Sequence, residues 1–256
     1  MGTIKTIAIT GKGGTGKTMI ATLLIKQLVE NYKDKRVLAI DADSAMSLPY
    51  TLNIDVKKTV SQLRKELVGP AQGKRMKQDG SLKEWIGEIV THADGFDLLV
   101  MGRPEEPGCF CAVNELLKYS ISTLVDDYDV VIIDGEAGPE QLNRRVLASI
   151  DELLVVSDMS ARSLATAGGI VDVARTGDNG IRIGSADLLL NRVRDDKPDQ
   201  AFLDKAGLQA IGWFPEDRLL NQYDRSGRSL LELPEESACV RSARELLRQL
   251  LEGNAG

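Results

Sequence analysis

The chain of 256 residues has a net charge of −6, and this acidic balance argues against non-specific nucleic-acid binding, which requires a basic surface. Its 43% of apolar residues can fill a core, whereas three cysteines are too few for a disulfide framework. The sequence has no apolar run near the roughly twenty residues of a membrane span and begins without a secretory or transit pattern, so we expect a cytoplasmic protein.

Short β-branched runs alternate with helical patterns, which predicts an α/β fold: a mostly parallel sheet with helices on both faces. Strands are expected at residues 4–10, 36–40, 98–101, 129–134, 152–157, 185–190 and 210–213. Helices are expected at residues 17–32, 112–124, 141–149, 161–175 and 235–251. Residues 69–95 are poor in apolar side chains and predict an irregular excursion with one short helix at 82–91. With no repeat or linker evident, we expect a single domain over residues 1–256.

Residues 4–32 have the order of strand, glycine-rich loop and helix that a P-loop requires. The stretch "GKGGTGKT" meets the pattern G-x-x-x-x-G-K-[ST], whose glycines let backbone N–H groups converge on phosphate. Lys17 would neutralise the β- and γ-phosphates, and the Thr18 hydroxyl would bind Mg²⁺. The other residues of this predicted cradle are Gly13, Gly14, Thr15 and Gly16.

A second lysine in this loop, Lys12, distinguishes it from an ordinary P-loop. The stretch "KGGTGKT" resembles the deviant Walker A motif of MinD, ParA, the nitrogenase iron protein and the arsenite-pump ATPases. The resemblance implies that Lys12 contacts a nucleotide phosphate across a dimer interface. A cation delivered in this way would stabilise charge on the transferring phosphoryl group. The alternative is a solvated loop lysine.

Carboxylates follow two of the expected strands. Asp41 and Asp43 in "IDAD", and Asp134 in "VVIIDGEAG", stand at the edge where an open α/β sheet binds ligands. The same resemblance implies that Asp43 orients the attacking water and that Asp41 helps to hold the Mg²⁺ environment. It also implies that Asp134 reaches Mg²⁺ through water and that Gly138 senses the γ-phosphate. Taken alone, Asp134 could also be a helix cap.

Two residues nearer the C-terminus are candidates for base recognition. Asn191 in "LLLNRVRDD" follows an expected strand at the place where the related proteins bind adenine through an asparagine amide. Pro215 in "IGWFPEDRLL" resembles the proline that lies beside the adenine ring in those proteins. Asn191 could equally start a turn.

Cys109 and Cys111, in "PGCFCAVNELL", lie at the expected start of an amphipathic helix. A helix N-terminus lowers the pKa of a thiol and so favours the thiolate. Two thiolates are too few for a tetrahedral metal site, and neither His92 nor Cys239 offers a clear complement. The missing donors could come from a second copy of the pair, related by a two-fold axis. Two incidental buried cysteines are the alternative.

In this order, "KGGTGKT", "DAD", "CFC", "DGEAG" and "LNRVR" resemble the CooC family over nearly the whole chain. Members of that family are nickel-insertion ATPases that mature carbon monoxide dehydrogenase and the related acetyl-CoA synthase. The resemblance implies Mg²⁺-dependent hydrolysis of ATP to ADP by a homodimer that holds one Ni²⁺ or Zn²⁺ ion on four cysteines. It also implies an apo metalloenzyme as client, with neither membrane nor nucleic acid as partner. In "DADSAMS", Ala45 and Met46 stand where CooC proteins commonly carry a further acid, so the client could differ.

Two related functions are alternatives. The nitrogenase iron protein holds an iron–sulfur cluster partly through a cysteine three residues after its switch II aspartate, and Ala137 stands there in this chain. That cluster arrangement cannot form here, although Cys109 and Cys111 of two chains could hold another cluster. MinD and ParA position cellular components through a basic tail or a basic patch, which this acidic sequence does not plainly supply.

Overall fold

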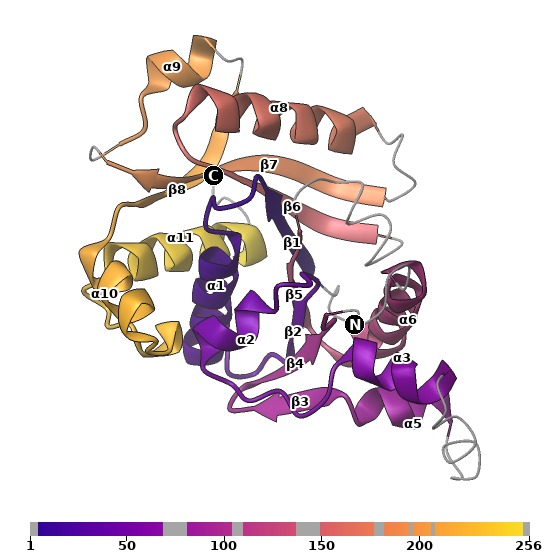
Figure 1. Cartoon of the computed structure of the whole chain (residues 1–256). Helices are drawn as coiled ribbons and strands as arrows, with labels where there is room; N and C mark the ends of the chain where they lie inside the picture. Colours follow the sequence, from indigo (N-terminus) through magenta and orange to yellow (C-terminus); the bar gives the residue numbers. More distant parts are fainter. Residues whose placement is uncertain are drawn as a thin grey trace.

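The computed structural model describes residues 5–68, 81–103, 110–136, 149–176, 182–194, 197–205 and 208–252. Their strands form one eight-stranded sheet in the order β3-β4-β2-β5-β1-β6-β7-β8 (Figure 1). These strands are β1 (Lys5–Gly11), β2 (Val37–Asp41), β3 (Val90–Ala93), β4 (Phe96–Val100), β5 (Val130–Asp134), β6 (Ser149–Ser157), β7 (Arg182–Val193) and β8 (Ala210–Pro215). All neighbouring strands run parallel except β3 and β4. The predicted mostly parallel sheet is confirmed.

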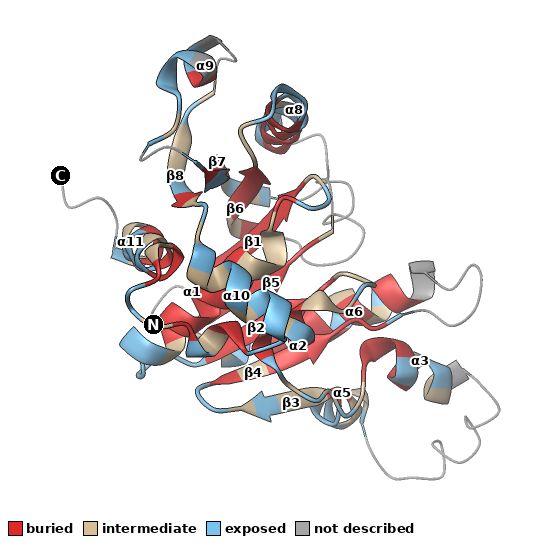
Figure 2. Ribbon diagram, turned by 60° about the vertical axis from the view of Figure 1, so that its left-hand side comes forward, coloured by how far each residue is buried: buried red, intermediate tan, exposed pale blue. Residues whose placement is uncertain are grey.

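Helices cover both faces of this sheet. They are α1 (Lys17–Asn31), α2 (Ser47–Leu52), α3 (Val60–Val68), α5 (Leu82–Gly87), α6 (Phe110–Leu124), α8 (Ala161–Thr176), α9 (Gln200–Lys205), α10 (Arg218–Ser226) and α11 (Ala238–Glu252). Two short 3₁₀ turns, η1 (Val125–Asp127) and η2 (Leu230–Glu232), complete the described elements. One apolar cluster lies under α3, α5, α6 and α8, and the other lies under α1, α2 and α11. Figure 2 shows the buried central strands between these two layers.

The central strands are apolar along their whole length because both of their faces are covered. In β5, all five residues from Val130 to Asp134 are buried. The register places Asp41, at the end of β2, directly beside Asp134, at the end of β5. Pairing of β1 with β5 places Ile9 on the other side of Asp134, so the strand that leads into the glycine-rich loop lies next to Asp134, and Asp41 is one strand further away.

The C-terminal helix α11 is part of the core. Its apolar stripe is buried and consists of Val240, Ala243, Leu246, Leu247 and Leu250. This stripe packs against α1 and β8. Within the described residues, no helix is both long enough and apolar enough to cross a membrane.

One expectation for the secondary structure was wrong. The helix expected at residues 82–91 ends at Gly87, and residues 90–93 form strand β3 in an antiparallel hairpin with β4. The turn of this hairpin is Asp94–Gly95, and Gly95 has a positive φ of 82°, as a tight hairpin turn requires. Most of the helix expected at 141–149 lies outside the described residues, but Ser149 already belongs to β6.

Candidate nucleotide site

The loop from Gly11 to Thr18 joins β1 to α1. Gly16 precedes the helix with a positive φ of 96°, and a Cβ atom there would lie 2.2 Å from Nδ2 of Asn191, so only glycine fits. No side chain caps the N-terminus of α1. Its first backbone N–H groups therefore remain available to an anion, which the helix dipole also favours.

Lys12 lies at the rim of this loop. Both the backbone N–H and the hydroxyl of Thr15 donate to the carbonyl oxygen of Lys12, at 3.3 and 2.8 Å, which closes the loop into a turn. The Lys12 side chain is half-buried and lies close enough to Asp158, just after β6, to influence its ionisation. Burial would raise the pKa of Asp158, but hydrogen bonds from Ser160 and the charge of Lys12 lower it overall.

Asp134 lies beneath the loop and is 1% exposed. Burial raises its pKa to about 6, although a hydrogen bond from the Thr18 hydroxyl and the charge of Lys17 act in the opposite direction. Its Oδ2 atom is buried without a hydrogen-bond partner. A buried carboxylate oxygen left unpaired beside a hydroxyl suits a hard cation with oxygen ligands, so Asp134 and Thr18 fit Mg²⁺.

Asp41 anchors the loop between β2 and α2. Its Oδ1 accepts from the backbone N–H of Asp43 and its Oδ2 from that of Leu48, both at 3.0 Å. The side chain is fully buried, and burial together with the nearby charge of Asp134 raises its pKa to about 8. Asp43, in contrast, lines the open cavity, and its Oδ1 accepts from the backbone N–H of Ala45 at 2.9 Å.

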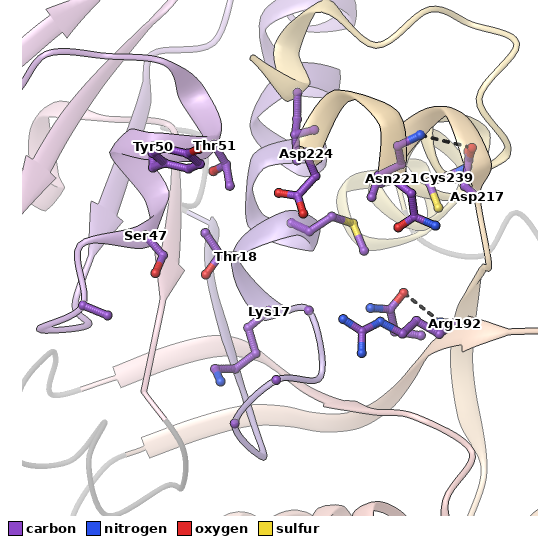
Figure 3. A pocket seen from close by; sticks show the side chains of 18 of the residues that line it. Lys17, Thr18, Ser47, Tyr50, Thr51, Arg192, Asp217, Asn221, Asp224 and Cys239 are labelled. Carbon is purple, nitrogen blue, oxygen red and sulfur yellow. Dashed lines mark hydrogen bonds between the residues drawn. The ribbon is translucent and has the colours of Figure 1, made fainter. Parts of the chain in front are cut away.

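A cavity of about 670 Å³ extends from Lys17 and Thr18 to the end of β8 (Figure 3). Residues of α2 form one wall, including Ser47, Tyr50 and Thr51, and residues of α10 form the opposite wall, including Leu220, Asn221 and Asp224. Pro215 lines the far end together with Asp217 and Cys239. A volume of this size suits a small organic ligand such as a nucleotide.

Asn191 is buried where β7 passes behind the loop. Its Nδ2 donates to the carbonyl oxygen of Thr15 at 2.7 Å, and its Oδ1 accepts from the backbone N–H of Arg192 at 2.9 Å. One donor and one acceptor of the amide are thus used within the protein. Asn191 also lines the cavity, and its amide keeps one N–H and one lone pair that these two bonds do not use.

Several lining residues were not identified from the sequence, among them Arg192 and Asp217. Arg192 has a positive φ of 57° at an irregularity in the pairing of β7 with β8, and its side chain enters the cavity. Asp217 caps α10 by accepting from the N–H groups of Leu219 and Leu220. A carboxylate just before a helical pattern, in "PEDRLL", was the available signal for this cap.

The cysteine pair is only partly within the described residues. Cys111 lies in the first turn of α6, as predicted, but its side chain is not described. Cys109 and Gly138 lie outside the described residues. Of the described acidic, histidine and cysteine residues, no group of three or more could hold a metal ion. Cys239 is buried, its Sγ lies 3.3 Å from the carbonyl oxygen of Pro215, and burial raises its pKa to about 12.

Comparisons with known proteins identify the family. A family model described as an AAA domain matches residues 4–177. The carbon monoxide dehydrogenase accessory protein CooC of Rhodospirillum rubrum is 30% identical over 261 residues, which cover 96% of this chain and 96% of that protein. The chain belongs to the CooC-type deviant Walker A ATPases.

Two further similarities agree with this assignment. The CooC-type ATPase described here is 36% identical to an uncharacterized ATP-binding protein of Methanocaldococcus jannaschii over 253 residues, covering 96% of this chain and 98% of that protein. The septum site-determining protein MinD of Pyrococcus horikoshii OT3, solved with Mg-ADP, matches with a TM-score of 0.69 at 23% identity, covering 97% and 96% of the two chains. At that identity the likeness shows the fold alone. The chain is an ATPase of this fold, which supports ATP or ADP and Mg²⁺ as its ligands.

Proposed function

We propose that this CooC-type ATPase is a metallochaperone that inserts nickel into a metalloenzyme of the carbon monoxide dehydrogenase or acetyl-CoA synthase type. The observation that carries the proposal is the Cys-x-Cys sequence at the start of α6, in a chain whose full-length relative is a carbon monoxide dehydrogenase accessory protein. Two copies of the ATPase would pair when nucleotide is bound. Four thiolates, Cys109 and Cys111 from each chain, would then hold one Ni²⁺ or Zn²⁺ ion as cargo.

The geometry of the cavity supports roles for particular residues in ATP hydrolysis. Lys17 and the N-terminus of α1 bind the β- and γ-phosphates. They lie next to Asp134, whose Oδ2 is buried without a hydrogen-bond partner. Thr18 and Asp134 would hold Mg²⁺, which would neutralise charge on the phosphate oxygens. Asp43 faces the same end of the cavity and orients the attacking water. Lys12, at the rim, contacts the phosphates of the partner chain.

The other end of the cavity would hold the nucleoside. Pro215 lies beside the base, and the amide of Asn191 reads its edge. The guanidinium of Arg192 enters the cavity near them and would contact the base as well. On the α10 wall, Asn221 and Asp224 supply polar atoms for the ribose hydroxyls.

Metal content tests the proposed function. Protein purified without oxygen should carry about one metal ion per two chains. Replacing Cys109 and Cys111 by alanine should remove that ion without unfolding the protein, whereas Cys239→Ala, a matched control for a buried thiol, should leave it in place. Elemental analysis with and without ATP measures this. Unchanged metal in the double variant would refute the shared site, and a visible iron–sulfur absorption in the wild type would favour the reductase alternative.

A further inference from the structure

Helix α2, which forms one wall of the nucleotide cavity, is too short to be stable on its own. It has six residues, whereas isolated helices shorter than about 12 residues are marginal in water. The residues that flank it, Met46 and Asn53, both have a left-handed backbone conformation, with φ of 56° and 57°. For a methionine this conformation is unfavourable and persists only where the surroundings impose it. The contacts of α2 with other elements therefore decide where it lies.

Hydrogen bonds join α2 to the two elements that carry the proposed ligand-binding groups, β2 and α1. The N–H of Leu48 in α2 donates to Oδ2 of Asp41, at the end of β2, at 3.0 Å. The hydroxyl oxygens of Thr51 in α2 and Thr22 in α1 lie 2.6 Å apart, a distance typical of an O–H···O hydrogen bond. We call Thr22 and Thr51 the hydroxyl pair.

The hydroxyl pair is connected to the backbone of both helices. The Thr22 hydroxyl lies 2.9 Å from the carbonyl oxygen of Thr18, and the Thr51 hydroxyl lies 3.0 Å from that of Leu48. When Thr51 donates to Thr22, Thr22 can donate to the carbonyl oxygen of Thr18. When Thr22 donates to Thr51, Thr51 can donate to that of Leu48. In both arrangements the bond between the helices forms, and Thr22 is 0% exposed, so water does not compete for it.

The two helices joined by the hydroxyl pair border the two sides of the proposed reaction site. Helix α1 begins with Lys17 and Thr18, and Thr18 lines the cavity together with Ser47 of α2 (Figure 3). The loop that leads into α2 carries Asp43, whose carbonyl oxygen accepts from the N–H of Met46 at 3.2 Å. A shift of α2 against α1 would therefore move Asp43 relative to the phosphate end of the cavity.

We infer that Thr22 is a positioning residue for ATP hydrolysis: through Thr51 it fixes α2, and with it Asp43, relative to the bound phosphate. The inference rests on the proposed role of Asp43. Attack of water on phosphorus requires reacting atoms about 3–3.5 Å apart and aligned, so the group that orients this water must be held closely. Loss of the hydroxyl pair should slow hydrolysis, whereas Lys17 and the first N–H groups of α1 should still bind nucleotide.

The test compares variants of the full chain. Thr22→Val and Thr51→Val each remove one hydroxyl of the pair with little change of shape, whereas Thr22→Ser keeps a hydroxyl. Ser120→Ala is the matched control, because it removes a hydroxyl that is also 0% exposed and that donates to the carbonyl oxygen four residues earlier in α6. A phosphate-release assay gives kcat for ATP, and calorimetric titration gives the Kd for ADP.

Thr22→Val should lower kcat about tenfold, the equivalent of one hydrogen bond, and leave the Kd for ADP within about twofold of the wild type. Thr51→Val should lower kcat to a similar extent; because Thr51 is only half-buried, this variant repeats the test should Thr22→Val fail to fold. The double variant should be no slower than either single variant, since both remove the same bond. Thr22→Ser and Ser120→Ala should keep kcat within about twofold of the wild type.

A second comparison asks whether Thr22 acts through Asp43. In single-turnover measurements, Thr22→Val should slow the wild type but cause no further slowing in an Asp43→Ala background. Equal slowing in both backgrounds would overturn the inference, as would wild-type kcat in Thr22→Val or an equal loss in Ser120→Ala. A loss of ADP affinity as large as the loss in kcat would overturn it too. Wild-type turnover by Asp43→Ala alone would instead overturn the proposed role of Asp43, and the inference with it.

Discussion

The unpaired oxygen of Asp134 and the fully bonded carboxylate of Asp41 lie side by side at the ends of adjacent strands. Both groups are buried, yet they have different partners: Asp41 holds two backbone N–H groups, whereas Asp134 faces Thr18 and Lys17. Because an unpaired buried oxygen costs free energy, a cation bound beside Asp134 Oδ2 would stabilise this carboxylate. Asp41 already has its partners and organises the loop that carries Asp43.

Substitutions of Asp43 and of Lys17 should impair different steps, hydrolysis and nucleotide binding respectively. Asp43→Ala should bind ADP within about twofold of the wild type and lose at least about a hundredfold in kcat, because it removes a group that acts on water rather than on phosphate. Lys17→Ala should lose nucleotide binding itself. Calorimetric titration with ADP and a phosphate-release assay separate the two effects. Normal turnover by Asp43→Ala would refute its assignment.

The raised pKa values of the two acids predict how stability changes with pH. The pKa of Asp41 rises from 3.8 to about 8, so between these values the unfolded chain loses a proton that the folded chain keeps. Without Mg²⁺ and nucleotide, the free energy of unfolding should therefore fall as pH rises from about 4 to 8, by at most about 1.4 kcal/mol per pH unit for this group. Asp134 acts in the same direction up to about pH 6.

Urea unfolding at several pH values in a chelator measures this dependence. Asp41→Asn should flatten the fall between pH 5 and 8, even though it also lowers stability by removing an acceptor from the loop. A wild-type stability that increases over this range would contradict the prediction.

At the scale of elements, α10 and α11 meet at one side chain. One oxygen of Asp217 caps α10, and the other accepts from the Ser237 hydroxyl at 2.6 Å and from the N–H of Cys239 at 3.1 Å. These hydrogen bonds lower the pKa of Asp217 although burial opposes them. No residue of α10 is fully buried, so packing against the core holds this helix only weakly. The hydrogen bonds of Asp217 at its N-terminus therefore contribute much of what fixes this wall of the cavity.

Asp217→Ala should therefore affect both stability and nucleotide binding. The lost cap should lower the free energy of unfolding by about 1–2 kcal/mol. Because the α10 wall is then less fixed, the Kd for ADP should rise about fivefold or more. Ser81→Ala removes the capping box of α5, away from the cavity, and is the matched control. It should lower stability with no change in Kd, and an equal Kd for wild type and Asp217→Ala would refute the role.

At the scale of the whole molecule, the glycine-rich loop, the two acids and the start of α6 all follow the carboxyl ends of strands in one sheet. Ligands of open α/β sheets bind at this edge. Nucleotide and metal cargo would thus be handled on the same side of the protein. A second copy that approached this edge would meet the half-buried Lys12 at its rim.

Pairing of two copies should depend on Lys12. With ATP and Mg²⁺, Asp43→Ala should accumulate as a dimer because it binds ATP without hydrolysing it. The double variant, Asp43→Ala with Lys12→Ala, should remain largely monomeric, because it lacks the lysine that would contact the nucleotide phosphates of the partner chain. Sedimentation velocity distinguishes the two. Dimers of equal stability in both variants would show that Lys12 acts only within its own chain.

The sequence alone was sufficient for the features that are local along the chain. "GKGGTGKT" between a strand and a helix identified the phosphate loop, and apolar runs ending in Asp41 and Asp134 placed both acids at a strand end. Seven of the eight described strands were predicted, because each is a short apolar run that is visible in the sequence. The short strand β3 was missed because its residues continue a helical pattern, and only pairing with β4 makes them a strand.

The tertiary structure decided the features that depend on distant segments meeting. The contact of Asn191 with Gly16 joins residues 175 positions apart, and the hydrogen bond from the Ser61 hydroxyl to the carbonyl oxygen of Arg103 joins residues 42 apart. Neither contact leaves a periodic pattern in the sequence, because each depends on the fold bringing distant segments together. A sequence motif identifies the groups that can bind phosphate or metal. Tertiary packing determines which other residues hold those binding groups in position.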